Sequence, residues 1–293
     1  MINTVFLFML FHSAHAVNCL RNSFEQRAMD VTQVANIDEM DRRTEKQYAA
    51  EKGMSLDVLK SKIAATGTIT CPFGLGSANV VGTEDLIVTV GHALVEQDER
   101  ACASAMVPPQ DCTFTYQTPN GPKTVKVKSL VGAGFKCPGS FSEENDWAVL
   151  RLEEPADVQP YAVGATKVKN DTDLIVVGAQ SSDFQVGEDG KIVSRHIGDC
   201  KARHTGPRKF FSNCDTGSGA SGGATLHPNL KQPTILGIVS GNDETTEQEK
   251  VAIQRNEPIT RTYDIATWKS IHTPIQGKFL STILSGMEEA PSN

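Results

Sequence analysis

A glycine-rich stretch around one serine constrains this chain more than any other part of the sequence. From Cys214 to Gly223 it reads Cys-Asp-Thr-Gly-Ser-Gly-Ala-Ser-Gly-Gly. Glycines on both sides of Ser221 permit a tight backbone turn, on which consecutive amide groups converge on one point. Such a turn exposes a serine as a nucleophile, and the amides of Gly219 and Ser221 would stabilise a developing oxyanion. Gly/Ser-rich turns are also ordinary surface loops, so partner residues must decide between the two interpretations.

Two upstream segments supply the partners that a serine nucleophile needs. An apolar run from Leu86 to Val90 leads to His92, as in a buried strand that ends in a turn. Asp146 precedes a second apolar run. A nucleophilic serine needs a base, and the base needs an acceptor that fixes its tautomer and stabilises its protonated form. We therefore predict that Ser221, His92 and Asp146 are the nucleophile, the base and the orienting carboxylate.

The chain order His, Asp, Ser resembles that of the chymotrypsin-like (trypsin-like) serine proteases and differs from that of α/β-hydrolases. Residues 236–241 resemble the strand after the nucleophile in that family, and residues 263–271 resemble the start of its closing helix. The similarity covers about residues 66–271. It is nearest to the secreted bacterial branch, including glutamyl-endopeptidase-like members, because Ala93 follows His92 where other members have a cysteine.

This resemblance implies an all-β fold of two six-stranded antiparallel β-barrels and a serine endopeptidase that hydrolyses proteins or peptides. The length of 293 residues accommodates two barrels, and 24 glycines and 14 prolines interrupt short apolar runs, as in all-β proteins. We place the protease domain at 66–276, with barrels at about 66–155 and 156–264, and expect a loosely attached tail at 277–293. The net charge of -7 lacks the basic footprint of a nucleic-acid-binding protein.

The first 16 residues are apolar and end in Ala14-His15-Ala16, which matches a secretory cleavage site. This run is too short to span a bilayer, and no other stretch approaches that length. We therefore expect a signal peptide at 1–16, a secreted or periplasmic protein, and no membrane span. The oligomeric state is left open by the sequence.

Residues 17–65 differ in character from the rest of the chain, because they are rich in charges of both signs. Ser23, Asn36 and Ser55 resemble helix N-caps, and Gly53 resembles a helix stop. We expect a helical extension, which is either a pro-segment or a strap across the barrels.

Seven cysteines remain after removal of a signal peptide, so at least one is unpaired within the chain. We expect a disulfide between Cys200 and Cys214, which bracket the approach to the nucleophile, and a local one between Cys102 and Cys112. Cys19 is the candidate for the odd thiol. His196, Cys200 and His204 recur every four residues, but the segment has the pattern of strand and loop, so we expect neither a metal nor another cofactor.

One departure from the family concerns the residue before the nucleophile, which is Ala220 where the family has Asp or Asn. The missing side chain normally holds the oxyanion-hole peptide from behind. In trypsin-style activation, cleavage at Lys62-Ile63 would free the amine of Ile63, which would pair with the aspartate before the nucleophile. Because this chain has Ala220 there, such activation is unfavourable. Ala220 also leaves an alternative function open, a catalytically silent protease-like binding or scaffold protein.

The resemblance also suggests a substrate preference. Asp215 lies six residues before Ser221, the offset at which the trypsin branch has an acidic pocket floor, and Ser240 and Asn242 fall on the strand that lines the pocket. This implies cleavage after Lys or Arg. A glutamyl preference is less favoured, because Val239 replaces the histidine that the glutamyl branch uses to bind glutamate.

Overall fold

The computed structural model describes residues 36–37, 42–72, 74–95, 106–135, 145–164, 167–179, 195–217, 219–242, 260–261, 263–264 and 269–289. These residues belong to one unit of the chain, residues 34–293. The expected signal peptide, the cap at Ser23, and Cys19 and Cys102 lie outside the described residues. None of the helices in the described ranges combines the length and the apolar character of a membrane span.

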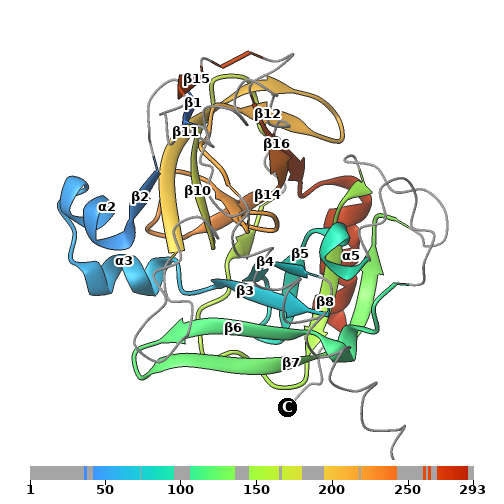
Figure 1. Ribbon diagram of the computed structural model, residues 1–293. Coiled ribbons are helices and arrows are strands. Elements are labelled where there is room, and N and C mark those ends of the chain that lie inside the picture. Colours follow the sequence, from blue (N-terminus) through green and yellow to red (C-terminus); the bar gives the residue numbers. More distant parts are fainter. Residues whose placement is uncertain are drawn as a thin grey trace, which may run out of the picture. The chain divides into compact units, whose positions relative to one another are not determined.

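The first barrel closes through six antiparallel strands in the order β3-β4-β5-β8-β7-β6 (Figure 1). The strands are β3 (Thr66–Cys71), β4 (Gly74–Val80), β5 (Leu86–Thr89), β6 (Thr113–Thr118), β7 (Gly121–Ala133) and β8 (Ala148–Leu152). Two short 3-10 helices, η1 (Gly91–Leu94) and η2 (Pro109–Asp111), lie between strands. Alternate apolar side chains such as Ile69, Phe114 and Val127 are fully buried, as the period of two predicts for strands with one buried face.

The second barrel is a ring of six antiparallel strands in the order β10-β13-β14-β16-β12-β11, closed by pairing between β10 and β11. The strands are β10 (Asp173–Ala179), β11 (Arg195–Thr205), β12 (Phe210–Ser212), β13 (Ala224–Leu226), β14 (Thr234–Asn242) and β16 (Ser270–Pro274). The predicted fold of two six-stranded antiparallel barrels is confirmed.

Short strands lie at the margins of this ring. β2 (Arg42–Thr44) pairs with β11 and β9 (Ala162–Val163) pairs with β14, while β1 (Asn36–Ile37) pairs with β15 (Thr260–Arg261) in a separate sheet. Asn36 therefore belongs to a strand, and its assignment as a helix cap is wrong.

The C-terminal part of the chain differs from the sequence-based expectation. Ile271 lies in strand β16 and not in a helix, so the second barrel extends beyond residue 264. The closing helix is α5 (Gly277–Glu288), in the segment expected to be a loose tail. Its Phe279 stacks on Trp147 of the first barrel with ring centroids 4.7 Å apart, and Arg151 donates to the Gly286 carbonyl at 2.6 Å. Apolar residues one turn apart, Phe279 and Ile283, bury one face of the helix and attach it.

Among the described residues, the helices α2 (Glu45–Glu51) and α3 (Leu56–Lys62) precede the first barrel. Thr44 and Gln47 form a capping box at the start of α2, and Ser55 caps α3 through the amide of Val58, as predicted for Ser55. Gly53, with φ +61°, ends α2 as predicted, because a left-handed residue after a helix lets the next amides bond back to its last carbonyls.

Both disulfides among the described residues stabilise connections near the site. Cys200 and Cys214 are bonded, which joins β11 to the approach to Ser221. Cys112 is bonded to Cys71, so the expected pairing of Cys112 with Cys102 is wrong. Cys71 ends β3 and Cys112 directly precedes β6, the strand that pairs with β3, and spacing along the chain does not reveal that neighbourhood.

Candidate active site

His92 and Asp146 meet at the end of the first barrel. β5 ends at Thr89 and continues into η1, which carries His92, while Asp146 lies two residues before β8, the strand that pairs with β5. The His92 Nδ1 lies 2.7 Å from Asp146 Oδ2, and the His92 backbone amide donates to Oδ1 at 2.9 Å. Ser240 of β14 donates its hydroxyl to Oδ2 at 2.8 Å. The Asp146 carboxylate, with 3% of its side chain exposed, is therefore held by donors from both barrels.

This arrangement fixes the tautomer of His92. An ionised carboxylate only accepts hydrogen bonds, so we assign the Nδ1 proton to the bond with Asp146 and leave Nε2 as the basic nitrogen. Burial of the ring lowers the pKa of His92, but the charge of Asp146 and its hydrogen bond outweigh burial, and the pKa is raised above its usual 6.5. The ring has the properties of a general base that is stabilised when it becomes protonated.

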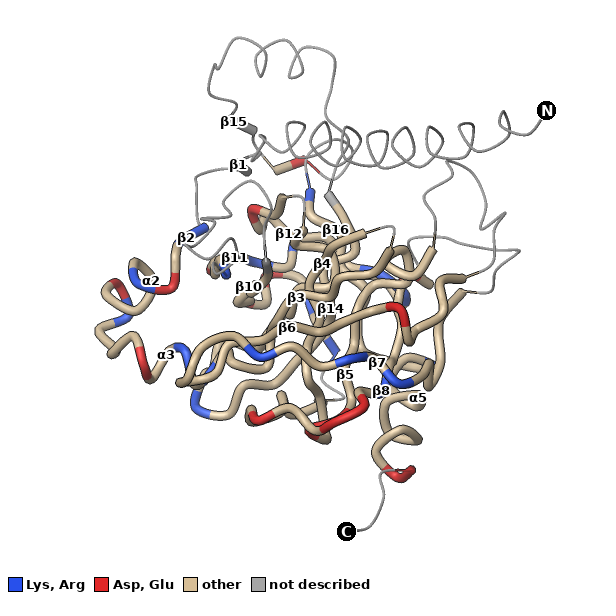
Figure 2. The backbone as a smooth tube through the Cα atoms, turned by 60° about the horizontal axis from the view of Figure 1, so that its bottom comes forward, with Lys and Arg blue, Asp and Glu red and all other residues tan. Residues whose placement is uncertain are grey.

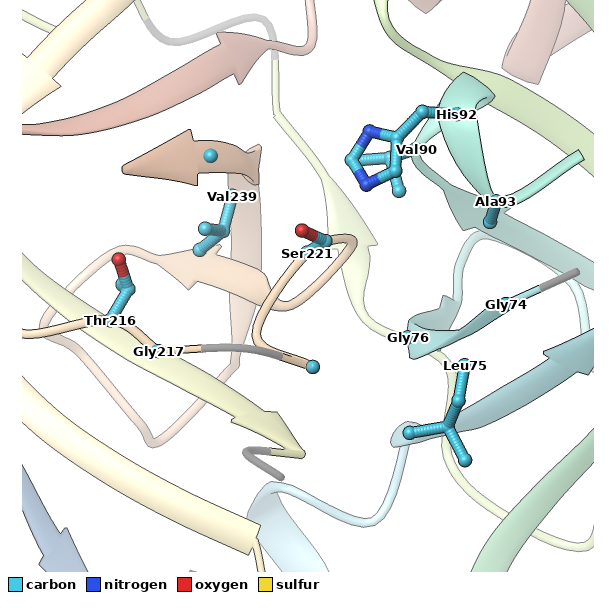
Figure 3. Close-up of a pocket in the computed structure, with 12 residues that line it drawn as sticks. Gly74, Leu75, Gly76, Val90, His92, Ala93, Thr216, Gly217, Ser221 and Val239 are labelled. Carbon is cyan, nitrogen blue, oxygen red and sulfur yellow. The ribbon is translucent and has the colours of Figure 1, made fainter. Parts of the chain in front are cut away.

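Ser221 projects from a tight loop of the second barrel, before β13. Gly219 and Gly222 both have φ +85°, a conformation that disfavours residues with a Cβ. The Ala220 amide donates to the Gly217 carbonyl at 3.0 Å, and the Gly223 amide donates to the Ala220 carbonyl at 2.7 Å. Within the part of the chain that the structure describes, the amides of Gly219 and Ser221 donate to no backbone carbonyl. Figure 3 shows Ser221 on this loop, between Val239 and His92 in that view.

A cavity of about 290 Å³ surrounds this hydroxyl. Thr216, Gly217 and Val239 line it on one side of Ser221, and the Gly74-Leu75-Gly76 segment of β4 lines it on the other (Figure 3). Gly241 also lines it. Among the described lining residues, His92 carries the single titratable side chain. The cavity therefore offers room for a chain segment on both sides of the nucleophile.

The structure brings four of the predicted site residues together: His92, Ser221 and Gly219 line the cavity, and Asp146 contacts His92. Ser240, expected to bind substrate, contacts Asp146 and is not among the lining residues.

Asp215 is 3% exposed and is also absent from the described lining, where its neighbour Thr216 appears. The side chain of Asn242 lies outside the described residues. The sequence analysis did not predict that Thr216 and the Gly74-Leu75-Gly76 segment of β4 line the cavity. For the β4 segment no signal was available, because no sequence spacing relates β4 to the nucleophile loop.

Comparisons with known proteins agree with this geometry. The family model of the trypsin-like peptidase domain matches residues 76–232, more than half of the chain. A comparison with curated proteins finds no match.

Solved structures share the fold. The structure of a Glu endopeptidase in complex with MPD aligns with a TM-score of 0.61 at 14% identity, covering 87% of this chain and 100% of that one. A thermostable serine protease, AL20, from an extremophilic microorganism aligns with a TM-score of 0.53 at 13% identity, covering 78% of this chain and 99% of that one. Identities this low establish the two-barrel fold and leave the substrate undecided. On the strength of the family match, this chain belongs to the family of trypsin-like peptidase domains and is a serine-type endopeptidase.

Proposed function

We propose that this protein is an exported serine endopeptidase that cleaves through Ser221, His92 and Asp146. The observation that carries the proposal is the pair of hydrogen bonds by which Asp146 holds both the ring and the backbone of His92, beside the glycine-rich loop of Ser221. Oxidised cysteine pairs in the described residues support export, because disulfides persist in oxidising compartments. The apolar segment 1–16 would direct it.

The reaction follows from the positions of these groups. As the Ser221 Oγ forms a bond to the peptide carbonyl carbon, its proton moves to Nε2 of His92, and the carbonyl oxygen becomes an oxyanion at the amides of Gly219 and Ser221. Collapse of this intermediate breaks the C–N bond, and the proton on Nε2 passes to the leaving amine. Water then attacks the acyl-enzyme and gives a proton to Nε2, which returns it to the Ser221 oxygen as the acid product leaves.

The preferred residue before the scissile bond depends on the wall formed by Thr216. The Ser270 hydroxyl donates its single proton to the Cys214 carbonyl at 2.7 Å. In the hydrogen bond of 2.7 Å between the Thr216 and Ser270 hydroxyls, Thr216 is therefore the donor. Thr216 therefore contributes an uncharged polar side chain to the lining, which offers no cation to a substrate carboxylate. This supports a preference for Lys or Arg over Glu, although Asp215 is buried behind the lining.

The name of the structurally similar Glu endopeptidase suggests the opposite preference. Val239 contributes an apolar side chain to the cavity wall, and the described lining offers no cation for a substrate carboxylate apart from His92. We therefore propose that this chain differs from that protein in its substrate.

Matched peptides with Arg, Gln, Glu or Ala before the scissile bond test the preference. We expect higher kcat/KM for Arg and Gln than for Glu, and we expect Thr216→Val to reduce this difference at least fivefold. Thr216→Ser, which keeps the oxygen, is the matched control and should retain the difference. Asp215→Ser tests whether Asp215 contributes to the preference as well. If the variant still prefers Arg, Thr216 is sufficient. Faster cleavage of the Glu peptide than of the Arg peptide by the wild type would refute a role in Arg preference for both residues.

Covalent labelling tests the catalytic assignment. We expect a fluorophosphonate probe to label the protein recovered outside the cytoplasm, and we expect Ser221→Ala to abolish labelling and to lower peptide hydrolysis by about 10⁶-fold. The melting temperature should change little, because a single hydroxyl at a cavity is removed.

The control for this experiment is Ser281→Ala, an exposed serine of α5 that should label and hydrolyse like the wild type. Hydrolysis that persists in purified Ser221→Ala would exclude Ser221 as the nucleophile. A wild-type protein that neither labels nor hydrolyses any peptide would instead favour the silent, protease-like binding protein.

A further inference from the structure

The residue before the nucleophile, Ala220, has no polar side chain that could hold the loop of Ser221. It is buried in an apolar cluster with Val176 and Val239. An oxyanion hole requires that the amides of Gly219 and Ser221 keep a fixed relative direction. The peptide between Gly219 and Ala220 connects these two amides, so its orientation decides whether they converge.

Side chains and backbone of the first barrel hold this loop. The Ser77 hydroxyl of β4 donates to the Gly219 carbonyl at 2.8 Å, and the Ser77 amide donates to the Ser221 carbonyl at 2.7 Å. The Asn79 side-chain amide donates to the Gly222 carbonyl at 2.7 Å. Three carbonyls of the nucleophile loop are therefore bound by one strand of the opposite barrel.

These donors are themselves fixed. Ser77 and Asn79 are fully buried, and the Thr89 hydroxyl donates to the Ser77 carbonyl at 2.7 Å. The side-chain oxygen of Asn79 (Oδ1) accepts from the Thr66 hydroxyl at 2.9 Å, which sets the direction of the side-chain NH₂ group of Asn79. A strand with such constraints is a rigid template for the loop.

The close approach depends on glycines. A Cβ on Gly76 would lie 2.9 Å from the Ser221 carbonyl oxygen, and a Cβ on Gly222 would lie 1.9 Å from the Ser77 carbonyl oxygen. Both distances are too short for a side chain, so these positions admit the contact between β4 and the loop only as glycine. Glycine is therefore required on both sides of this contact, at Gly76 in β4 and at Gly222 in the loop.

We infer that Ser77 is a positioning residue of the active site, which holds the Gly219–Ala220 peptide in the orientation that forms the oxyanion hole. This inference rests on the proposed function. The carbonyl of that peptide is bound by Ser77 and its N–H by the Gly217 carbonyl, so both ends resist a flip. The first barrel thereby replaces the support that a polar residue at position 220 would give from within the second barrel.

The kinetic consequence is specific, because an oxyanion exists in the transition state and not in the bound substrate. We expect Ser77→Ala to lower kcat by about 10- to 100-fold, the scale at which a misplaced catalytic group reduces the rate, while KM changes less than threefold. The second-order rate of fluorophosphonate labelling should fall in parallel, because phosphonylation develops charge at the same amides.

A matched pair of variants isolates the hydroxyl. Ser77→Thr and Ser77→Val add the same volume, but the threonine keeps the donor, so we expect Thr to retain at least tenfold more kcat than Val. Thr225→Val removes another buried hydroxyl of the second barrel, one that contacts His272 and not the loop, and should lower stability while leaving kcat within twofold.

The outcomes separate this inference from the proposed function. If the wild type is labelled and hydrolyses peptides but Ser77→Ala changes only the melting temperature, or if Thr and Val lose kcat equally, Ser77 has no positioning role and the inference is overturned. If the wild type itself neither labels nor hydrolyses, the proposed function fails first.

Discussion

At the residue scale, buried polar side chains with complete sets of partners determine the chemistry of this site. Asp146 accepts from the backbone and ring of His92 and from Ser240, which stabilises its charge in a buried position. His272 shows the opposite case. It is fully buried between the hydroxyls of Ser212, at 2.6 Å, and Thr225, at 2.9 Å, and burial lowers its pKa to about 3. In the proposed mechanism His92 accepts a proton during the reaction, whereas His272 remains neutral as part of the core.

The raised pKa of His92 predicts the pH dependence of the enzyme. Protonated His92 cannot accept the Ser221 proton, so kcat/KM should rise with pH through the pKa of the free enzyme. Because Asp146 raises this pKa above its usual value, we expect the midpoint of the acid limb above pH 6.5, followed by a plateau.

Initial rates on a peptide substrate between pH 4.5 and 9.5 measure this midpoint. Ser281→Ala, a change at an exposed residue of α5, provides the reference profile. A midpoint well below 6.5, or maximal activity at the acid end of this range, would contradict a neutral histidine base oriented by a carboxylate.

At the element scale, the helices α2 and α3 are integrated into the fold. Figure 1 shows them beside β2, and their Tyr48, Leu59 and Ile63 side chains are buried in the main hydrophobic core. The Tyr48 hydroxyl also donates to Asp199 of β11 at 2.8 Å. These contacts favour the strap over the removable pro-segment for residues 42–65, since removal would expose part of the core.

Arg195 of β11 is the polar centre of this attachment. Its guanidinium donates to the Glu45 carboxylate at 2.7 Å and to the carbonyls of Ile63 and Thr66 at 2.7 and 3.0 Å. Arg195→Ala removes the donor from the two buried carbonyls and from the partly buried Glu45 carboxylate, so we expect the free energy of unfolding to fall by about 3 to 5 kcal/mol.

Urea unfolding of the purified variant measures this loss. Arg203→Ala on the same strand removes an exposed ion pair with Asp171 and should cost less than about 1 kcal/mol. Equal effects of the two substitutions would show that residues 42–65 are not anchored through Arg195.

At the scale of the whole described unit, one main core includes residues of both barrels, and the second barrel has a further cluster of its own. The main cluster of buried apolar residues includes Phe114 and Val127 from the first barrel and Val177 and Ile238 from the second. The first barrel contributes His92 and Asp146, the second contributes Ser221, and bonds from β4 cross between them. The site therefore exists only when both barrels are folded and docked.

In the view of Figure 2, residues of both charges lie along the described chain. The expectation that nucleic acid is not a partner stays a prediction from composition.

The strand that leads to His92, the strand that follows Asp146 and the glycine-rich turn of Ser221 were predictable from local patterns, namely apolar runs that end at polar residues and glycines around a nucleophile. The two barrels were implied by the resemblance of the order His92, Asp146, Ser221 to that of the trypsin-like proteases. Helix caps at Ser55 and Gly53 were predictable for the same reason, because a cap depends on neighbouring residues alone.

Only the tertiary structure decided which residues support the site. The bond from Ser77 to Gly219 spans 142 positions of the chain, and the attachment of the helices through Arg195 spans 150. The pairing of Cys71 with Cys112 and the burial of Phe279 in a helix expected to be loose are also contacts between distant segments. Such contacts arise from the packing of one barrel against the other, and no local spacing encodes them, because many arrangements of strands satisfy the same alternating pattern.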